Sequence, residues 1–404
     1  MAPEAESKNG GRRKIGRVLV ISEVFPPQIG GSGRWLYEVF SRASSFESIH
    51  VLAPPLASQG AVDEVCPELL AVSRTYRVPE DAGFFVPRGM IAYAGLVWEV
   101  VRLHRLHRFE RVYCGSCVTP GWVAWLVKKV LRIPYVCFVH GEEVFFPEDE
   151  PPTGLLSSRQ LRFQMRLIVS SADRLIANSN NTARLLEESW GVPSERLRVM
   201  HPGVDASHYV PTEYSPSIRA RLGWSGKQVV LTVGRLQRRK GHDMMIRAMP
   251  RILESAPDVL YVIVGNGGEL DYLRSLVNEC GVQASVVFRT DASDTELLQM
   301  YQQCDLFALP NRRVGADIEG FGIVLLEAQA CGKPVVAGRS GGTRETLKEG
   351  VSGVLVDCGD PDSIAREVLR MLADERRLVA MGNAARQWIE GNFDWSKLAC
   401  ELLN

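Results

Sequence analysis

The chain has no net charge. Its 404 residues include 47 Lys and Arg and 47 Asp and Glu, so the formal charge at pH 7 is zero. A protein that binds nucleic acid usually shows an excess of basic residues, and the overall balance provides no argument for such a partner. We therefore expect no nucleic-acid ligand.

Long apolar runs are also lacking. No segment approaches the roughly 20 apolar residues that a helix needs to cross a bilayer. The first 14 residues, which end in Arg12-Arg13-Lys14, contain no apolar core of a secretion signal, and we predict that 1–14 is a disordered tail. The nine cysteines are scattered, which is typical of a reducing compartment. We expect a cytoplasmic protein.

The sequence shows no complete metal site. Cys114 and Cys117 form the only close pair of cysteines, and no second pair or histidine cluster accompanies them. Asp360-Pro361-Asp362 matches the Asp-x-Asp pattern of metal-dependent sugar transferases. However, Pro361 fits the first position of a helix, and Asp360 would then be its N-cap. We expect no metal and no resident cofactor.

Short apolar runs alternate with helical patterns along the whole chain. This alternation is typical of parallel strands that are connected by helices and covered on both faces. We predict an α/β protein with two doubly wound, Rossmann-like parallel sheets that face each other across a cleft. The predicted strands are Arg17–Ser22, Ile49–Ala53, Arg111–Tyr113, Tyr135–His140, Arg174–Ala177, Leu197–Met200, Gln228–Val233, Val259–Val264, Val286–Phe288, Leu306–Leu309, Pro334–Ala337 and Gly353–Val356.

A less periodic, proline-containing stretch separates the two series of strands. We predict an N-terminal domain over 15–205, a linker over 206–227 and a C-terminal domain over 228–390. Residues 391–404 form a final helix that could cross back to the N-terminal domain. Ligands of such sheets bind beyond the carboxyl ends of the strands.

A basic loop follows the first strand of the second series. Gly234 and Arg235 begin this loop, and Lys240 ends it just before a predicted helix. Positive charge and backbone N–H groups at a helix start are what a diphosphate requires. The P-loop pattern is not matched. We interpret Arg235 and Lys240 as ligands, and Arg238 and Arg239 as solvated side chains.

Two glutamates, Glu319 and Glu327, stand eight positions apart around a Gly320-Phe321-Gly322 turn. A carboxylate within an apolar helix start is costly to bury unless it has partners. The glycines would let a ligand approach the backbone, and the helix start favours an anion such as phosphate. The alternative is a surface helix with Glu327 in water.

His140 and the pair Gly30-Gly31 follow other predicted strands. A neutral His140 imidazole at a carboxyl strand end could bond a sugar hydroxyl, or it could be structural. Gly30 and Gly31 would allow close backbone approach, or they could simply form a turn. A full G-x-G-x-x-G is absent, and no acidic residue ends the second strand, which argues against a nicotinamide cofactor.

Two predicted helices combine aromatic and basic residues. One contains Trp98, Arg102 and Arg105, and the other contains Trp122 and Trp125 with nearby lysines. Such helices can lie on an anionic membrane surface. The alternative is a helix with one core face and one solvated face.

Taken in chain order, these motifs resemble a known family. Gly30-Gly31, His140-Gly141, the Arg235 to Lys240 spacing and the Glu319 to Glu327 pair are similar to those of the retaining GT-B glycosyltransferases of family four. The resemblance extends from Arg17 to the C-terminal helix. A weaker resemblance is to GDP-mannose-dependent mannosyltransferases that act on phosphatidylinositol mannosides.

The resemblance implies a role for each motif. Arg235 and Lys240 would hold the diphosphate of a nucleotide-sugar, Glu327 would bind the ribose, and Glu319 and His140 would contact the donor sugar. The implied catalytic residues are His140, Glu319, Arg235 and Lys240. The implied donor-binding residues are Gly30, Gly31, Gly234, Arg235, Lys240, Glu319, Gly320, Phe321, Gly322, Ile323 and Glu327.

The implied activity is that of a metal-independent, retaining hexosyltransferase. It would transfer mannose from GDP-mannose to a lipid or glycan acceptor, with peripheral contact at the inner face of the membrane. The alternatives are a transferase that uses UDP-glucose or UDP-N-acetylglucosamine, a nucleotide-sugar 2-epimerase, and a non-catalytic nucleotide-sugar-binding module.

Overall fold

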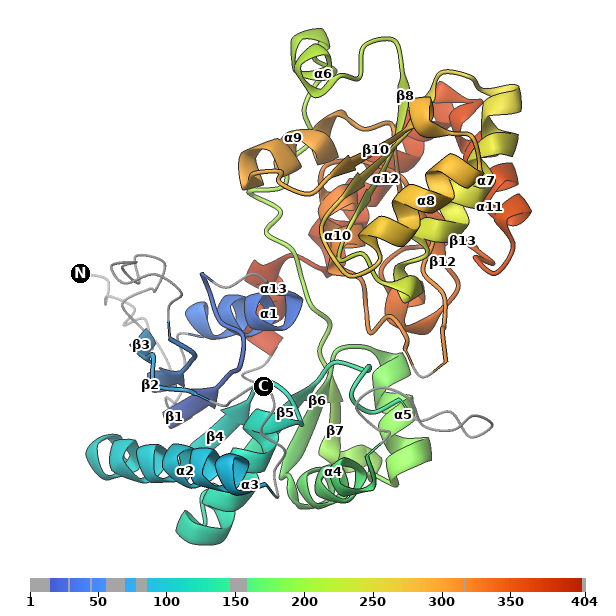
Figure 1. The fold of residues 1–404 in the computed structure, drawn as a ribbon. Helices are drawn as coiled ribbons and strands as arrows, with labels where there is room; N and C mark the ends of the chain where they lie inside the picture. The colour runs from blue at the N-terminus through green and yellow to red at the C-terminus, as the bar shows by residue number, and fades with distance from the viewer. Residues whose placement is uncertain are drawn as a thin grey trace, which may run out of the picture. The chain divides into compact units, whose positions relative to one another are not determined.

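The computed structural model describes residues 15–27, 30–43, 46–55, 70–77, 86–145, 158–315 and 317–401. The predicted tail, 1–14, lies outside these residues. The chain divides into two compact units (Figure 1). The first unit holds the described residues up to Cys137, with Ser171–Asp173 and the last described residues from Ala399. The second unit holds the described parts of Phe138–Ser170 and Arg174–Leu398.

The first sheet has seven strands in the order β3-β2-β1-β4-β5-β6-β7. The recorded pairs, from β1 with β2 to β6 with β7, are parallel. Because the order reverses at β1, the connecting helices cover both faces. The strands are β1 Ile15–Ile21, β2 Phe46–Leu52, β3 Leu70–Ser73, β4 Arg111–Cys114, β5 Tyr135–Val139, β6 Arg174–Ala177 and β7 Leu197–Val199.

The helices between these strands have recognisable ends. At α5, the Ser179 side chain accepts a hydrogen bond from the Thr182 N–H, and Gly191 closes the helix in the left-handed conformation. The helices of this part are α1 Gly31–Ser41, α2 Pro87–His107, α3 Thr119–Leu131, α4 Arg159–Ser171, α5 Asn180–Trp190 and the 3-10 turn η2 Ser194–Arg196.

The second sheet has six strands in the order β10-β9-β8-β11-β12-β13, and its recorded pairs are parallel. Its strands are β8 Gln228–Val233, β9 Val259–Val264, β10 Val286–Arg289, β11 Leu306–Leu309, β12 Val335–Gly338 and β13 Gly353–Val356. Its helices are α6 Pro216–Leu222, α7 His242–Ser255, α8 Leu270–Glu279, α9 Asp294–Gln303, α10 Ile323–Ala330, α11 Pro361–Leu372 and α12 Glu375–Asn392, with 3-10 turns η3 Arg238–Lys240, η4 Gln283–Ser285 and η5 Gly341–Glu345. The last described helix is α13 Trp395–Glu401, whose residues are divided between the two units at Leu398.

The core of the second sheet forms two layers. Val230 packs in a cluster with residues of α7, α8 and α11, whereas its neighbours Val229 and Leu231 pack in a second cluster with residues of α9 and α10. Successive residues of a strand point to opposite faces, so both faces of this sheet are buried. This arrangement explains why its strands are continuous apolar runs in the sequence.

The predicted fold class is confirmed in its two doubly wound parallel sheets. Two elements were not predicted: β3, an edge strand, and α6, which lies inside the predicted linker. The expected N-cap is present, because the Asp360 side chain accepts hydrogen bonds from the N–H groups of Asp362 and Ser363. Within the described residues, no helix is long and apolar enough to span a bilayer. The predicted domain boundaries stay predictions.

Candidate functional site

The loop between β8 and α7 places Lys240 at a helix start. Lys240 ends η3, and Gly241 opens α7 with a positive φ of 75°. A Cβ at Gly241 would lie 1.7 Å from the Pro310 carbonyl oxygen, so only glycine fits there. Gly234 lies at the other end of the loop, where a Cβ would be 3.8 Å from the Lys240 Cε atom and 4.0 Å from its Nζ atom. Arg235 is exposed, and no ion pair joins it to another described residue.

Lys240 and Glu319 form a buried ion pair. The Lys240 Nζ lies 2.6 Å from the Glu319 Oε2, and the two residues are 9% and 7% exposed. Burial would raise the pKa of Glu319, but the positive charges of Lys240 and Arg239 outweigh it and hold this pKa below its usual range. The structure thus brings together two residues that are 79 positions apart in the sequence and were both predicted to belong to the site.

The prediction that Arg239 is solvated is wrong. Arg239 is only 4% exposed, because three carboxylates surround its guanidinium. Its nitrogens lie 2.6 Å from Glu319, 2.8 Å from Asp317 and 3.2 Å from Glu142. These partners outweigh the desolvation of Arg239 and raise its pKa. A basic run in a loop normally indicates solvated side chains, and nothing local distinguishes Arg239 from Arg238.

The turn before α10 approaches His140 closely. A Cβ at Gly320 would lie 2.0 Å from the His140 carbonyl oxygen, so the backbones touch directly. Gly322 is the N-cap of α10 and has a φ of 96°, which favours glycine. Within the described part of the chain, no acceptor is recorded for the N–H groups of Phe321, Gly322 and Ile323. These groups are available to an anion at the helix start.

The Phe321 side chain supports the turn from behind. It is 3% exposed and stacks on the His201 ring, with 5.3 Å between the ring centroids. The His201 Nε2 lies 2.8 Å from a Glu345 oxygen, and this carboxylate also accepts the N–H groups of Asn180 and Asn181. Phe321 therefore anchors the turn, and its backbone rather than its side chain is free for a ligand.

Glu327 lies one turn into α10 and is half-buried. The Tyr301 hydroxyl donates a 2.6 Å hydrogen bond to its carboxylate. Burial and the nearby Glu327 raise the pKa of Tyr301, which keeps the phenol protonated as a donor. No sequence motif indicated that Tyr301, from α9, would donate a hydrogen bond to this carboxylate.

His140 and Gly141 follow β5 in the second unit. The Asn178 amide donates to the His140 carbonyl oxygen at 3.0 Å, and the Glu143 carboxylate accepts the His140 N–H at 3.1 Å. Gly141 has a φ of 95°. These contacts fix the backbone of His140 beside the Gly320 turn.

Gly30 and Gly31 lie in the first unit, where they start α1. Gly30 is the N-cap residue, and its carbonyl oxygen accepts the Arg34 N–H at 3.0 Å. The other predicted site residues belong to the second unit, so the predicted grouping of these two glycines with them stays a prediction.

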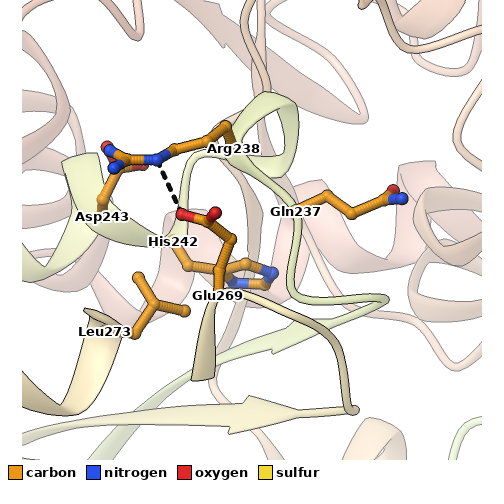
Figure 2. Close-up of a pocket in the computed structure, with 6 residues that line it drawn as sticks. All are labelled: Gln237, Arg238, His242, Asp243, Glu269 and Leu273. Carbon is orange, nitrogen blue, oxygen red and sulfur yellow. Dashed lines mark ion pairs between the residues drawn. The ribbon is translucent and has the colours of Figure 1, made fainter. Parts of the chain in front are cut away.

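A small pocket lies beside the same loop (Figure 2) and was not predicted. It is lined by Gln237, Arg238, His242, Asp243, Glu269 and Leu273. An ion pair of 2.6 Å joins Arg238 to Glu269, and Arg238 also lies over the Tyr272 ring at 3.8 Å. Burial lowers the pKa of His242 to about 4, so this imidazole is neutral near pH 7. Arg238 therefore holds the β8–α7 loop against the start of α8.

No group of three His, Cys, Asp or Glu residues that could hold a metal is found in the part of the chain that the structure describes. The expectation that the protein uses no metal stays a prediction.

Two family models match the chain. The model described as Glycosyltransferase Family 4 matches residues 29–208, and the model described as Glycosyl transferases group 1 matches residues 215–388. Two Rossmann-like parallel sheets are the architecture of the GT-B glycosyltransferases. The chain belongs to the family-four GT-B glycosyltransferases, and the resemblance of its motifs to this family is confirmed.

The similar proteins include named enzymes. The chain is 34% identical to a GDP-mannose-dependent alpha-(1-6)-phosphatidylinositol monomannoside mannosyltransferase of Mycolicibacterium smegmatis, over 95% of this chain and 97% of the relative. It is also 30% identical to a GDP-mannose-dependent monoacylated alpha-(1-6)-phosphatidylinositol monomannoside mannosyltransferase of Corynebacterium glutamicum, over 96% of this chain and 97% of the relative. Among solved structures, Anabaena HepE in complex with UDP and glucose has a TM-score of 0.75 and 25% identity, over 96% of this chain and 98% of that one.

Proposed function

We propose that this glycosyltransferase moves mannose from GDP-mannose to a mannosylated phosphatidylinositol acceptor and retains the configuration of the transferred sugar. The mannose and the lipid acceptor rest on relatives at 30–34% identity whose names carry that activity and which match along nearly their full length. The donor site rests on one observation, the buried Lys240–Glu319 pair next to the N–H groups at the start of α10.

The chemistry follows from the charges of the site. When the bond between the sugar and the diphosphate breaks, negative charge grows on the departing phosphate. Lys240, the exposed Arg235 and the N–H groups of Phe321, Gly322 and Ile323 would stabilise this charge. The ionised Glu319 carboxylate accepts hydrogen bonds and would therefore orient hydroxyl groups of the sugar. No metal is included in this proposal, because the cations and the helix start supply the positive charge.

We place the protein in the cytoplasm, in peripheral contact with the inner face of the membrane. In α2, Ile91 is 73% exposed, Trp98 is 65% exposed and Leu106 is 66% exposed, and Arg102 and Arg105 are also exposed. Apolar side chains with neighbouring cations suit an anionic lipid surface. In α3, by contrast, Trp122 is buried against Trp125, so this helix supports the alternative of a core face.

A donor panel tests the proposed reaction. The protein is incubated with GDP-mannose, UDP-glucose or UDP-N-acetylglucosamine and vesicles that contain phosphatidylinositol mannoside, and release of nucleoside diphosphate and formation of glycolipid are measured. We expect turnover with GDP-mannose, an α-linked product and co-sedimentation of the protein with the vesicles. If only a UDP-sugar supports transfer to the acceptor, the proposed donor GDP-mannose is wrong and the UDP-sugar takes its place. This is the main alternative, because the similar structure of HepE contains UDP and glucose. Conversion of a UDP-sugar without an acceptor would indicate an epimerase, and binding without any turnover would indicate a non-catalytic module.

A further inference from the structure

Glu319 has two cationic partners on one oxygen. The Oε2 atom lies 2.6 Å from the Lys240 Nζ and 2.6 Å from a terminal nitrogen of Arg239. A single close cation is enough to pair a carboxylate. The second one is unexpected for a side chain that is only 7% exposed, because each buried charge has its own desolvation cost.

The two cations are held in different ways. The recorded ion-pair partner of Lys240 among the described residues is Glu319, and the end of the lysine side chain lies beside Gly234. Arg239 is fixed from several sides: Asp317 and Glu142 hold its side chain, and its carbonyl oxygen accepts the Arg312 N–H at 2.8 Å. Lys240 therefore has fewer recorded anchors than Arg239, so a new anion would draw the lysine away from Glu319 more easily than the arginine.

The proposed donor brings a competing anion. A diphosphate that binds at the start of α7 or α10 would attract the Lys240 ammonium away from Glu319. Without another cation, Glu319 would then be a buried and unpaired carboxylate, which is strongly unfavourable. Such a group takes up a proton and loses the ability to accept two hydrogen bonds from sugar hydroxyls.

We propose that Arg239 is a positioning residue that keeps Glu319 charged and in place while Lys240 turns from this carboxylate to the diphosphate of the nucleotide-sugar. The assignment rests on the proposed function for the identity of the anion. It goes beyond it, because Arg239 would not itself touch the donor. The proposal also explains why three carboxylates surround one arginine. Asp317 and Glu142 hold the guanidinium in position, and the guanidinium in turn pairs with Glu319 and keeps it charged.

Carboxylate titration by NMR tests this assignment without turnover. The protein is labelled with ¹³C at the glutamate side-chain carboxyl, the signal of Glu319 is identified by its loss in Glu319→Gln, and the titration is followed between pH 2.5 and 8. The charged groups that face Glu319 are Lys240, Arg239 and Arg235, and Asp317 and Glu142 act through Arg239. We expect Arg239→Gln to raise the pKa of Glu319 by about one unit, and Arg239→Lys, which keeps the charge, to raise it much less.

Addition of GDP separates the inference from a merely structural role. In the wild type, we expect Glu319 to stay ionised when GDP occupies Lys240. In Arg239→Gln, GDP should raise the pKa of Glu319 further. The substitution removes the Arg239 charge and GDP binds the Lys240 ammonium, so this carboxylate then has neither cation as a partner. Arg251→Gln is the matched control, since Arg251 is a partly exposed arginine of α7 whose partner is Asp362, and it should change nothing.

The outcomes are distinct. An unchanged pKa of Glu319 in folded Arg239→Gln, with or without GDP, would overturn the role of Arg239. If Arg239→Gln unfolds, an upward shift in Arg239→Lys as large as one unit would also contradict it, because the charge is retained there. If GDP does not bind to the wild type, the proposed function fails, but the titration without nucleotide still decides whether Arg239 keeps Glu319 ionised.

Discussion

At the scale of single residues, the site depends on a carboxylate in a place where burial opposes its charge. Glu319 is ionised because Lys240 and Arg239 share one of its oxygens. Its folded-state pKa is lowered, so the ion pairs contribute stability above the pKa of an unfolded glutamate, and this contribution is lost as the pH falls through the folded-state value. Acid should therefore weaken both the fold around this turn and the donor site.

Although their role in a donor site stays a prediction, Glu319 and Lys240 were singled out from the sequence, because glycines and a helix start lie near each of them. Arg239 was not, because its burial depends on partners that are 80 and 97 positions away along the chain. Tyr301 was unpredictable for the same reason: it lies on α9 and bonds Glu327 of α10. Tertiary contacts of this kind leave no periodic pattern near the residue concerned.

Lys240→Ala tests the role of the lysine directly. We expect kcat/KM for the nucleotide-sugar to fall by the equivalent of about 1.5–3 kcal/mol, roughly 10- to 160-fold, because a charged hydrogen bond to the diphosphate is lost. Steady-state kinetics with varied donor measure this effect. Lys348→Ala, which removes an exposed lysine, is the control. Equal kinetics for both variants would remove Lys240 from the donor site.

At the scale of elements, the candidate site residues lie where loops join strands to helices. The β8–α7 loop carries Lys240, and the turn before α10 carries Glu319 and the available N–H groups. The apolar strands of both sheets and the Asp360 N-cap of α11 were predicted, because strand patterns and capping residues are local signals. β3 and α6 were missed for other reasons. β3 is an edge strand with only one fully buried residue, so it is not a continuous apolar run, and α6 begins at Pro216 in a stretch that its prolines marked as a linker.

The Gly320 turn offers a test at this scale. We expect Gly320→Ala to lower the stability by about 1–3 kcal/mol and to reduce kcat/KM for the donor, because a Cβ 2.0 Å from the His140 carbonyl oxygen must displace the backbone. Thermal unfolding and donor kinetics are compared with Gly391→Ala. In α12 a Cβ at Gly391 has nothing within 4 Å, and alanine favours the helix. If Gly320→Ala matches the wild type in both assays, the close approach does not position the turn.

At the scale of the whole molecule, two parallel sheets provide two sets of carboxyl strand ends. The alternation of strands and helices was enough to predict both sheets. The second unit alone contains Lys240, Glu319, Glu327 and the start of α10, which are the groups expected to hold a nucleotide-sugar. The sequence motifs could not specify the base of the nucleotide. The base is recognised by contacts from loops, and no sequence pattern in these loops identifies which base they bind.

Nucleotide binding tests whether Lys240, Glu319, Glu327 and the start of α10 form a site for a nucleoside diphosphate. The melting temperature of the wild-type protein is measured with GDP, UDP and ADP over a range of concentrations, and calorimetry gives the stoichiometry. We predict one saturable site that prefers GDP, with stabilisation of about 2.7 kcal/mol at a concentration 100 times Kd. If none of the three nucleoside diphosphates binds or raises the melting temperature, the account is contradicted.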